Sequence, residues 1–394
     1  MTSATAPVTA PDAAVAAPGT GVAAPAAAPE APEYALLPSA RPVSFIDADG
    51  RAAAPGPRPY PVPDDTELVA AHRALVVGRR LDQQATNLAK QGELAVYPSS
   101  LGQEACQIGA ALALGPQDWL FPTYRDCVAI MTRGVDPVET LTLMRGDWHC
   151  GYDPVAHRIA PQCTPLATQA PHAVGLAHAA RLRGEDTVAL VLIGDGATSE
   201  GDFHEALNFA AVFKAPVVFL VQNNAYAISV PLDRQTAAPS LAHKGIGYGM
   251  PGERVDGNDV AAVLGVLRHA VERARRGEGP TLVEAHTYRM EPHSNADDAG
   301  RYRDADEVAR WRHRDPIARL ETYLTERGLL TDADVRAAAD EAEERAAALR
   351  TGIVRSGPPS PDALLREVTA DDSAQLARDR ELLLRELERE EDTP

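Results

Sequence analysis

Two apolar runs, each followed by a short polar motif, constrain the fold of this chain more than any other feature. The run TVALVLI leads into Gly194-Asp195-Gly196, and the run PVVFLVQ leads into Asn223-Asn224. Such uninterrupted runs are typical of strands in a parallel sheet that is covered on both faces. Asp195 and Asn224 are 29 residues apart, which fits a strand end, a helix and the end of a following parallel strand. Both are therefore expected at the carboxyl edge of the sheet, where α/β proteins bind ligands.

Helical and strand patterns alternate along most of the chain. Further strands are expected at 254–256 and 281–286. Helices are expected at 66–90, 102–114, 136–144, 170–183 and 202–213, and from a cap at Asn258 to residue 276. Charged helices are expected at 333–350 and 376–390. The alternation predicts an α/β fold with a doubly wound, mostly parallel sheet, flanking helices and right-handed crossovers.

Composition divides the chain into four segments. Residues 1–33 are rich in Ala and Pro, so they have too few large side chains to offset the entropy of ordering, and a disordered tail is predicted. Residues 34–63 are Pro-rich with a few large apolar side chains, and an extended surface segment is expected. Residues 64–325 form the predicted α/β domain. Residues 326–394 form a helical C-terminal segment that packs on this domain or on a partner.

Charge and cysteine content narrow the class of protein. The formal charge of −18 disfavours binding to nucleic acid, because phosphate backbones are repelled. No apolar run is long enough to cross a membrane, and the Arg-poor N-terminus fits neither a secretory signal nor a transit peptide. The cysteines (Cys106, Cys127, Cys150 and Cys163) form no C-x-x-C pair, so reduced thiols in a cytoplasmic protein are expected, and Cys150 beside His149 gives little support for a zinc site.

The two polar motifs offer oxygen ligands for a metal ion. The carboxylate of Asp195, the side-chain amide of Asn224 and the backbone carbonyl of Tyr226 form a set that suits Mg²⁺, which commonly completes its coordination with phosphate oxygens and water. A helix beginning near Asp202 would direct its N-terminus to the same edge. An acidic chain could hold a diphosphate in this way. A lone Asp-Gly is often only a turn, but the Asn-Asn pair after the next buried strand favours a site.

The motifs together resemble the α subunit of the thiamine diphosphate-dependent decarboxylating component of 2-oxo acid dehydrogenases. The similarity is carried by GDGATSEGDFHEALNFAAVFKAPVVFLVQNNAYAIS, FPTYRD, TPLATQ, RVDGND and YRMEPHSNADDAGRYR, and it covers about residues 65 to 325. The resemblance implies the thiamine diphosphate-binding fold, with thiamine diphosphate and Mg²⁺ as cofactors.

The resemblance also implies roles for individual residues. Asp195, Asn224 and the carbonyl of Tyr226 are expected to bind Mg²⁺, and His293 is the expected catalytic residue. Contacts with the cofactor are expected from Tyr124, Arg125, Thr164, Leu166, Gly196, Ala197, Gln222 and His293. Gln222 stands where some branched-chain relatives have an arginine on the diphosphate, which weakens the expected phosphate contact. Ser294 matches a position that is phosphorylated in some relatives, and we treat it as unmodified.

The TPLATQ motif is similar to the branched-chain subgroup of the family. In that subgroup the same turn holds K⁺, and the expected ligands here are the carbonyls of Cys163 and Pro165 and the side chains of Thr168 and Gln169. The other interpretation is a simple helix N-terminus with Thr168 as its cap. Both interpretations stay open at the level of sequence.

The resemblance implies oxidative decarboxylation of a 2-oxo acid such as 2-oxoisovalerate, with transfer of the acyl group to a lipoyl group on a dihydrolipoyl acyltransferase core. In this family the glutamate that activates thiamine belongs to a smaller β subunit. A heterotetramer with that subunit is therefore predicted, and the chain alone should be inactive. The alternatives are a pyruvate or acetoin dehydrogenase α subunit and, in another class, a non-catalytic thiamine diphosphate-binding regulatory subunit.

Overall fold

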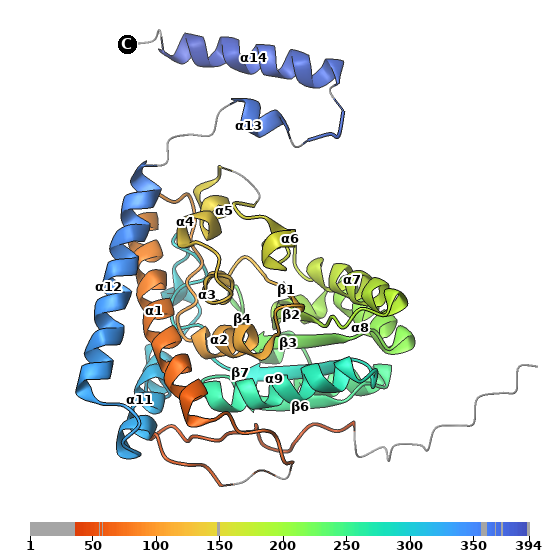
Figure 1. The fold of residues 1–394 in the computed structure, drawn as a ribbon, viewed down its shortest axis with the longest axis vertical. Helices are drawn as coiled ribbons and strands as arrows, with labels where there is room; N and C mark the ends of the chain where they lie inside the picture. Colours follow the sequence, from red (N-terminus) through yellow and green to blue (C-terminus); the bar gives the residue numbers. More distant parts are fainter. Residues whose placement is uncertain are drawn as a thin grey trace, which may run out of the picture. The chain divides into compact units, whose positions relative to one another are not determined.

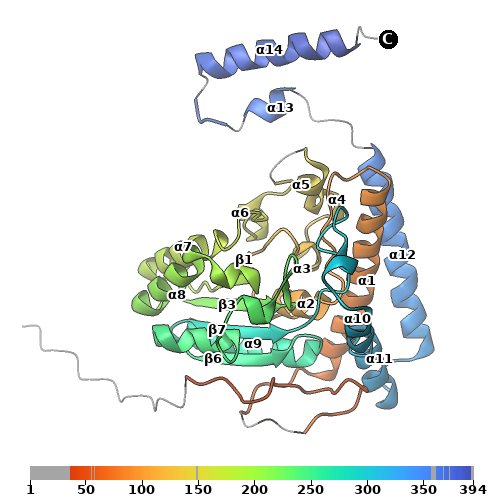
Figure 2. The ribbon, with the colours of Figure 1, turned by 180° about the vertical axis from the view of Figure 1, so that it is seen from behind.

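The structure is a computed structural model, and it describes residues 36–54, 56, 58–147, 150–355, 361–366, 368–371 and 373–391. The predicted disordered tail and His149 lie outside the described residues. The described chain forms the helices and strands of an α/β fold (Figures 1 and 2). The strands are β1 (Trp119–Phe121), β2 (Ala189–Gly194), β3 (Val217–Asn223), β4 (Tyr226–Ala227), β5 (Val230–Pro231), β6 (Gly252–Asp256) and β7 (Thr281–His286).

The helices lie before, between and after these strands along the chain. The α-helices are α1 (Asp65–Lys90), α2 (Glu104–Ala113), α3 (Cys127–Thr132), α4 (Pro137–Thr140), α5 (Thr142–Arg145), α6 (Pro154–His157), α7 (Gln169–Arg183), α8 (Gly201–Phe213), α9 (Val260–Arg275), α10 (Ala305–Arg312), α11 (Pro316–Glu326), α12 (Asp332–Arg355), α13 (Pro361–Arg366) and α14 (Ala374–Glu391). The 3₁₀ helices are η2 (Gly196–Ser199), η3 (Leu232–Arg234), η4 (Leu241–Tyr248) and η5 (Ala299–Arg301).

The five-stranded sheet has the order β1-β2-β3-β7-β6, and every neighbouring pair in it is parallel. This confirms the predicted parallel α/β sheet. The short strands β4 and β5 form a separate antiparallel pair beyond the end of β3. Since β2 and β3 are direct neighbours in the centre of the sheet, the motifs that follow them leave the sheet at the same edge.

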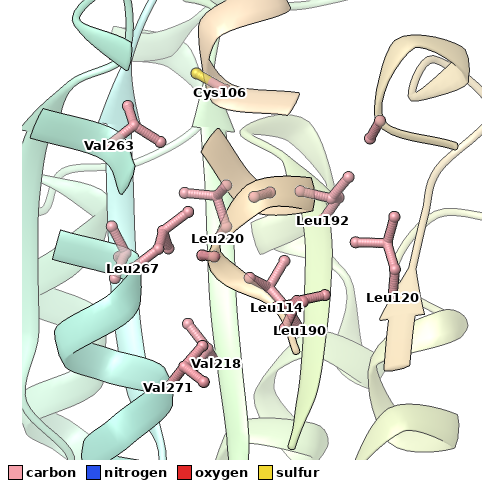
Figure 3. Packing of buried hydrophobic residues seen from close by; sticks show 14 of the residues in the cluster. Cys106, Leu114, Leu120, Leu190, Leu192, Val218, Leu220, Val263, Leu267 and Val271 are labelled. Carbon is pink, nitrogen blue, oxygen red and sulfur yellow. The ribbon is translucent and has the colours of Figure 1, made fainter. Parts of the chain in front are cut away.

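Both faces of the sheet are covered by apolar side chains, which explains the uninterrupted apolar runs. Alternate residues of each strand face opposite ways: Leu190 and Leu192 pack with α2 and α9, whereas Val191 and Ile193 pack with α7 and α8. Figure 3 shows the first of these layers, with Val263 and Leu267 of α9 directed at the central strands. The layers fix the positions of β2 and β3, and therefore of the motifs that follow them.

The segment before α1 is tied to the sheet edge by buried carboxylates. Glu253 of β6 accepts hydrogen bonds from the backbone and hydroxyl of Ser39 at 2.8 and 3.1 Å and from Arg58 at 2.8 Å. Asp259 accepts from the backbone N–H groups of Phe45 and Ile46 at 2.6 and 2.7 Å. The domain boundaries proposed from the sequence stay a prediction.

The helix expected at 136–144 was wrong as a single element. It is two short helices, α4 and α5, because Leu141 between them has ψ near 1°, outside the range of a regular helix. Strand β1 was not predicted, since three residues give no recognisable alternation.

The cap of α9 was also assigned to the wrong residue. Asp259 is the cap, and its carboxylate accepts from the N–H groups of Ala261 and Ala262. The side chain of Asn258 is used elsewhere: its nitrogen donates to the carbonyl of Arg314, and its oxygen accepts from the hydroxyl of Thr287.

Candidate active site

Asp195 and Asn224 lie together at the carboxyl edge of the sheet. Gly194 of β2 is paired with Gln222 of β3, so the residues that follow these two emerge side by side. The backbone N–H of Asn224 also lies near enough to the carboxyl group of Asp195 to lower its pKa. The convergence expected from the 29-residue spacing is therefore present in the structure.

The Asp195 carboxylate is 1% exposed and has little compensation for its charge. Burial raises its pKa, while a hydrogen bond from Gln235 Nε2 to Oδ2 (2.8 Å) and the more distant charge of Arg289 oppose that rise. A buried carboxylate without an adjacent cation is costly, because ionisation is favoured only when a positive charge is near. The position therefore fits a carboxylate that is completed by a metal ion.

Asn224 and Tyr226 add two oxygens to this edge. The Asn224 side-chain nitrogen donates to Gln103 Oε1 at 2.9 Å, and its Oδ1 accepts from the backbone N–H of Tyr226 at 3.2 Å. The carbonyl of Tyr226 accepts from Arg289 at 3.3 Å. Each of the two oxygens keeps a second lone pair, so with Asp195 they form the hard, oxygen-only set that Mg²⁺ prefers. No cluster of three or more His, Cys, Asp or Glu side chains suited to a metal occurs in the described part of the chain.

Arg125 and His293 form a hydrogen-bonded pair that lines the same site. Arg125 is 5% exposed; its Nη1 donates to the Ser99 carbonyl (2.9 Å), and its Nη2 contacts His293 Nδ1 (3.1 Å) and donates to the His293 carbonyl (3.0 Å). A guanidinium only donates, so Nδ1 must be the acceptor and the ring proton lies on Nε2. Burial, with the charges of Arg125 and Arg289, lowers the pKa of His293 to about 4. The neutral imidazole thus offers an Nε2–H donor.

Arg289 is a residue of the site that sequence reasoning did not identify. It follows β7, is 1% exposed, and donates to the carbonyls of Tyr226 and Ile228 and to the Tyr302 hydroxyl. Its Nε has no hydrogen-bond partner among the described residues. Burial and the charge of Arg125 lower its pKa. One feature of the sequence could have identified it: Arg289 stands three residues after the predicted strand at 281–286, which ends at the same edge of the sheet. Two buried guanidinium groups at one site favour an anionic ligand.

A cavity of about 790 Å³ connects these groups. Its lining includes every residue predicted for the site except Thr168: Tyr124, Arg125, Cys163, Thr164, Pro165, Leu166, Gln169, Asp195, Gly196, Ala197, Gln222, Asn224, Tyr226 and His293. Ser294 also lines it, as do Gln103 and Gln235, which were not predicted. The cavity is large enough for a cofactor-sized ligand.

The turn before α7 has its own geometry. Thr168 occupies the N-cap position, as the simple-cap interpretation expects, but its side chain makes no capping hydrogen bond and instead donates to Asp202 Oδ2 at 3.4 Å. The choice between a cap and a K⁺ site stays a prediction. The Cys163 thiol donates to the Pro165 carbonyl at 3.1 Å, and Ala167 has a positive φ of 64°. Gln169 Nε2 donates to the Leu192 carbonyl, and its buried Oε1 has no partner among the described residues.

Comparison with known proteins identifies the family. The model of the dehydrogenase E1 component matches residues 72–349, and the chain belongs to this family. It is 47% identical over 348 residues to the 3-methyl-2-oxobutanoate dehydrogenase subunit alpha of Mycobacterium tuberculosis, covering 88% of this chain and 95% of that protein. It is 41% identical over 304 residues to the 2-oxoisovalerate dehydrogenase subunit alpha of Bacillus subtilis (71% and 91%), and 41% identical over 297 residues to the pyruvate dehydrogenase E1 component subunit alpha of Staphylococcus aureus (72% and 80%).

Membership of this family makes the chain an oxidoreductase component of a dehydrogenase complex, and it implies thiamine diphosphate as the cofactor. No helix within the described residues is long and apolar enough to span a membrane. The cytoplasmic location expected from the sequence stays a prediction.

Proposed function

We propose that the chain is the α subunit of a branched-chain 2-oxo acid dehydrogenase that acts on substrates such as 2-oxoisovalerate. The observation that carries this proposal is the convergence of Asp195, Asn224 and the Tyr226 carbonyl at one sheet edge, in a chain of the E1 family. When bound, thiamine diphosphate supplies the electron sink for loss of carbon dioxide from the 2-oxo acid. The acyl group then passes to a lipoyl group of an acyltransferase partner.

In this proposal each wall of the cavity has a separate task. Asp195, Asn224 and Tyr226 hold Mg²⁺, which neutralises the diphosphate in a chain of net charge −18. Arg125, beside Tyr124, donates to phosphate oxygens, and Gly196 and Ala197 lie against them. Neutral His293 offers its Nε2–H near the reacting carbon, where it orients the substrate or exchanges a proton. Thr164 and Leu166, which line the same cavity, would contact the thiazolium side of the bound cofactor.

The turn at residues 163–169 is proposed as a K⁺ site. Its support is the buried Gln169 Oε1, an acceptor without a partner among the described residues. A buried amide oxygen left unpaired costs free energy, which a cation would recover. The carbonyls of Cys163 and Pro165 and the hydroxyl of Thr168 belong to the same turn and would complete the set.

The branched-chain substrate rests on relatedness and on the TPLATQ motif. The relative named for 3-methyl-2-oxobutanoate is 47% identical, whereas the one named for pyruvate is 41% identical. Because the relative named for pyruvate is still 41% identical, a pyruvate-specific α subunit is the second candidate. In either case we propose a β subunit as an obligate partner in a heterotetramer, because the family takes its thiamine-activating glutamate from that subunit.

Asp195→Ala in the coexpressed α/β pair tests the metal assignment. The variant should lose Mg²⁺-dependent binding of thiamine diphosphate, measured by calorimetric titration with and without Mg²⁺, because the only carboxylate of the ligand set is gone. Asp186→Ala is the matched control: Asp186 is exposed and pairs with Arg275 away from the cavity, so its binding should be unchanged. Full Mg²⁺-dependent affinity in Asp195→Ala would overturn the assignment.

A further inference from the structure

A chain of hydrogen-bonded amides ends on the side chain of Asn224. Gln222 Nε2 donates to Asp126 Oδ1 at 2.7 Å, Gln103 Nε2 donates to Gln222 Oε1 at 3.1 Å, and Asn224 Nδ2 donates to Gln103 Oε1 at 2.9 Å. We call this the amide relay: Asp126, Gln222, Gln103 and Asn224. All four side chains are buried, with exposed fractions of 0%, 2%, 2% and 6%.

Asp126 determines which way the amide groups of the relay are turned. Its Oδ2 accepts from both the backbone N–H and the hydroxyl of Thr123, at 2.7 and 2.6 Å, while Oδ1 takes the Gln222 donor. Burial raises the pKa of Asp126, while the hydrogen bonds from Thr123 and Gln222 and the charge of Arg125 oppose that rise. The ionised carboxylate can only accept, so Gln222 turns its NH₂ toward Asp126 and its oxygen toward Gln103. Gln103 is then forced to turn its NH₂ to Gln222 and its oxygen to Asn224.

The last step fixes the amide of Asn224. With its NH₂ held by Gln103, its Oδ1 faces the other way, toward the backbone of Tyr226 and the edge where Asp195 lies. We infer that Gln222 and Gln103 are positioning residues that present the Asn224 oxygen, and not the nitrogen, to Mg²⁺. This inference rests on the proposed function, because it takes Asn224 as a metal ligand.

The relay assigns Gln222 a different task from a phosphate contact. Its nitrogen and its oxygen both have protein partners, so its amide is held within the protein. The relay also joins three elements of the site: Gln103 precedes α2, Gln222 belongs to β3, and Asp126 precedes α3 directly after Arg125. The relay therefore links the proposed metal ligand Asn224 to Asp126, the neighbour of Arg125, whose guanidinium is proposed to contact the phosphates. Groups that orient metal ligands typically change metal affinity by about 10- to 100-fold when they are removed.

The test is Gln222→Met in the coexpressed α/β pair, which keeps the side-chain volume and removes the amide. The Mg²⁺ concentration for half-maximal binding of thiamine diphosphate should rise about tenfold. Binding at saturating Mg²⁺ should recover, because the diphosphate itself loses no contact. Gln84→Met is the control: Gln84 is a buried amide on α1 whose oxygen accepts from Arg80, outside the cavity, and its Mg²⁺ requirement should equal that of the wild type.

A double-mutant cycle shows whether Gln222 acts through Gln103. Gln103→Met alone should raise the Mg²⁺ requirement as well, and adding Gln222→Met to it should cost little more. If Gln222→Met fails to fold, Gln103→Met provides an independent test of the inference. Thermal unfolding of each α/β pair shows whether the variant is folded.

Four results would count against these statements, and they differ. A wild-type Mg²⁺ requirement in folded Gln222→Met or Gln103→Met overturns the relay. Additive losses in the double variant would also overturn it, since they mean that the two residues act independently. A loss for Gln222→Met that persists at saturating Mg²⁺ would overturn it too, since that means direct contact with the cofactor. If the wild-type pair itself shows no Mg²⁺-dependent binding of thiamine diphosphate, the proposed function fails, and the relay's role in metal binding fails with it.

Discussion

At the scale of single residues, the neutral state of His293 depends on the pH of the solution. Its pKa is lowered from 6.5 to about 4, first by burial and then by Arg125 and Arg289. Between these two pH values the unfolded chain binds the proton and the folded chain does not. The contribution of His293 to the stability of the fold therefore falls as the pH drops from 6.5 toward 4.

Replacing His293 should flatten this dependence. The free energy of unfolding of His293→Gln, measured by urea titration of the chain, should decrease less than that of the wild type between about pH 7 and about pH 5. His313→Gln is the control variant measured beside it: His313 is exposed, contacts Asp49 at 3.4 Å and lies outside the cavity. Equal slopes for His293→Gln and the wild type would contradict the lowered pKa.

Arg125 should act on the phosphates of the cofactor and not on its rings. Arg125→Met in the α/β pair should weaken binding of thiamine diphosphate by about tenfold or more, the usual cost of a lost charge-assisted hydrogen bond. Binding of thiamine, which lacks the phosphates, should change little; fluorescence titration with both ligands measures the difference. Arg310→Met, at an exposed position, is the control. An equal loss for both ligands would argue against a phosphate contact.

The predictability of the site differs from residue to residue. Asp195 and Asn224 could be found because a strand end and a motif fix their place in the chain. Gln235 and Gln103 could not, because their roles arise only from contacts across 40 and 121 residues of sequence. Gln235 lies in a long connection without periodicity, so nothing local indicated that its amide would bond to Asp195.

At the scale of elements, the close approach of η2 to β4 positions the site. A Cβ added at Gly196 would lie 2.6 Å from the Cβ of Ala227, the residue directly after Tyr226. Gly196→Ala should therefore displace β4 and with it the Tyr226 carbonyl. We expect at least about a tenfold loss in Mg²⁺-dependent affinity for thiamine diphosphate.

Gly201→Ala is the matched control for this substitution. Gly201 begins α8 close by, and a Cβ there would meet no atom within 4 Å. Calorimetric titration should give wild-type affinity for Gly201→Ala. Wild-type affinity for Gly196→Ala as well would mean that β4 has room to yield and that this contact does not position the site.

The elements themselves were predictable where the pattern was strong. β7 has the predicted bounds, and β3 differs by one residue at each end, because buried parallel strands give uninterrupted apolar runs. The cap of α9 was misplaced by one residue because Asn and Asp both favour that position. Tertiary partners of Asn258 decided between them, and these are not visible in the local sequence.

At the scale of the whole molecule, the charge distribution agrees with a cofactor enzyme. The chain carries −18 overall, yet Arg125 and Arg289 are both buried at the cavity. Burying these two guanidinium groups costs free energy, because a buried cation without a counter-charge is unfavourable. A bound anion would offset that cost. The acidic surface plays no part in that contact. Two buried positive charges thus lie at the cavity of a chain whose net charge is negative, which agrees with the proposed binding of a diphosphate.

The most direct test of the proposal is the rate of decarboxylation by the coexpressed α/β pair, with Mg²⁺ and thiamine diphosphate, on 2-oxoisovalerate and on pyruvate. The expected result is a kcat/KM for 2-oxoisovalerate at least about tenfold above that for pyruvate, because a branched side chain buries more apolar surface in a fitted pocket. The chain without its β subunit should show no turnover. A preference for pyruvate would contradict the branched-chain assignment, and turnover by the chain alone would contradict the need for a partner.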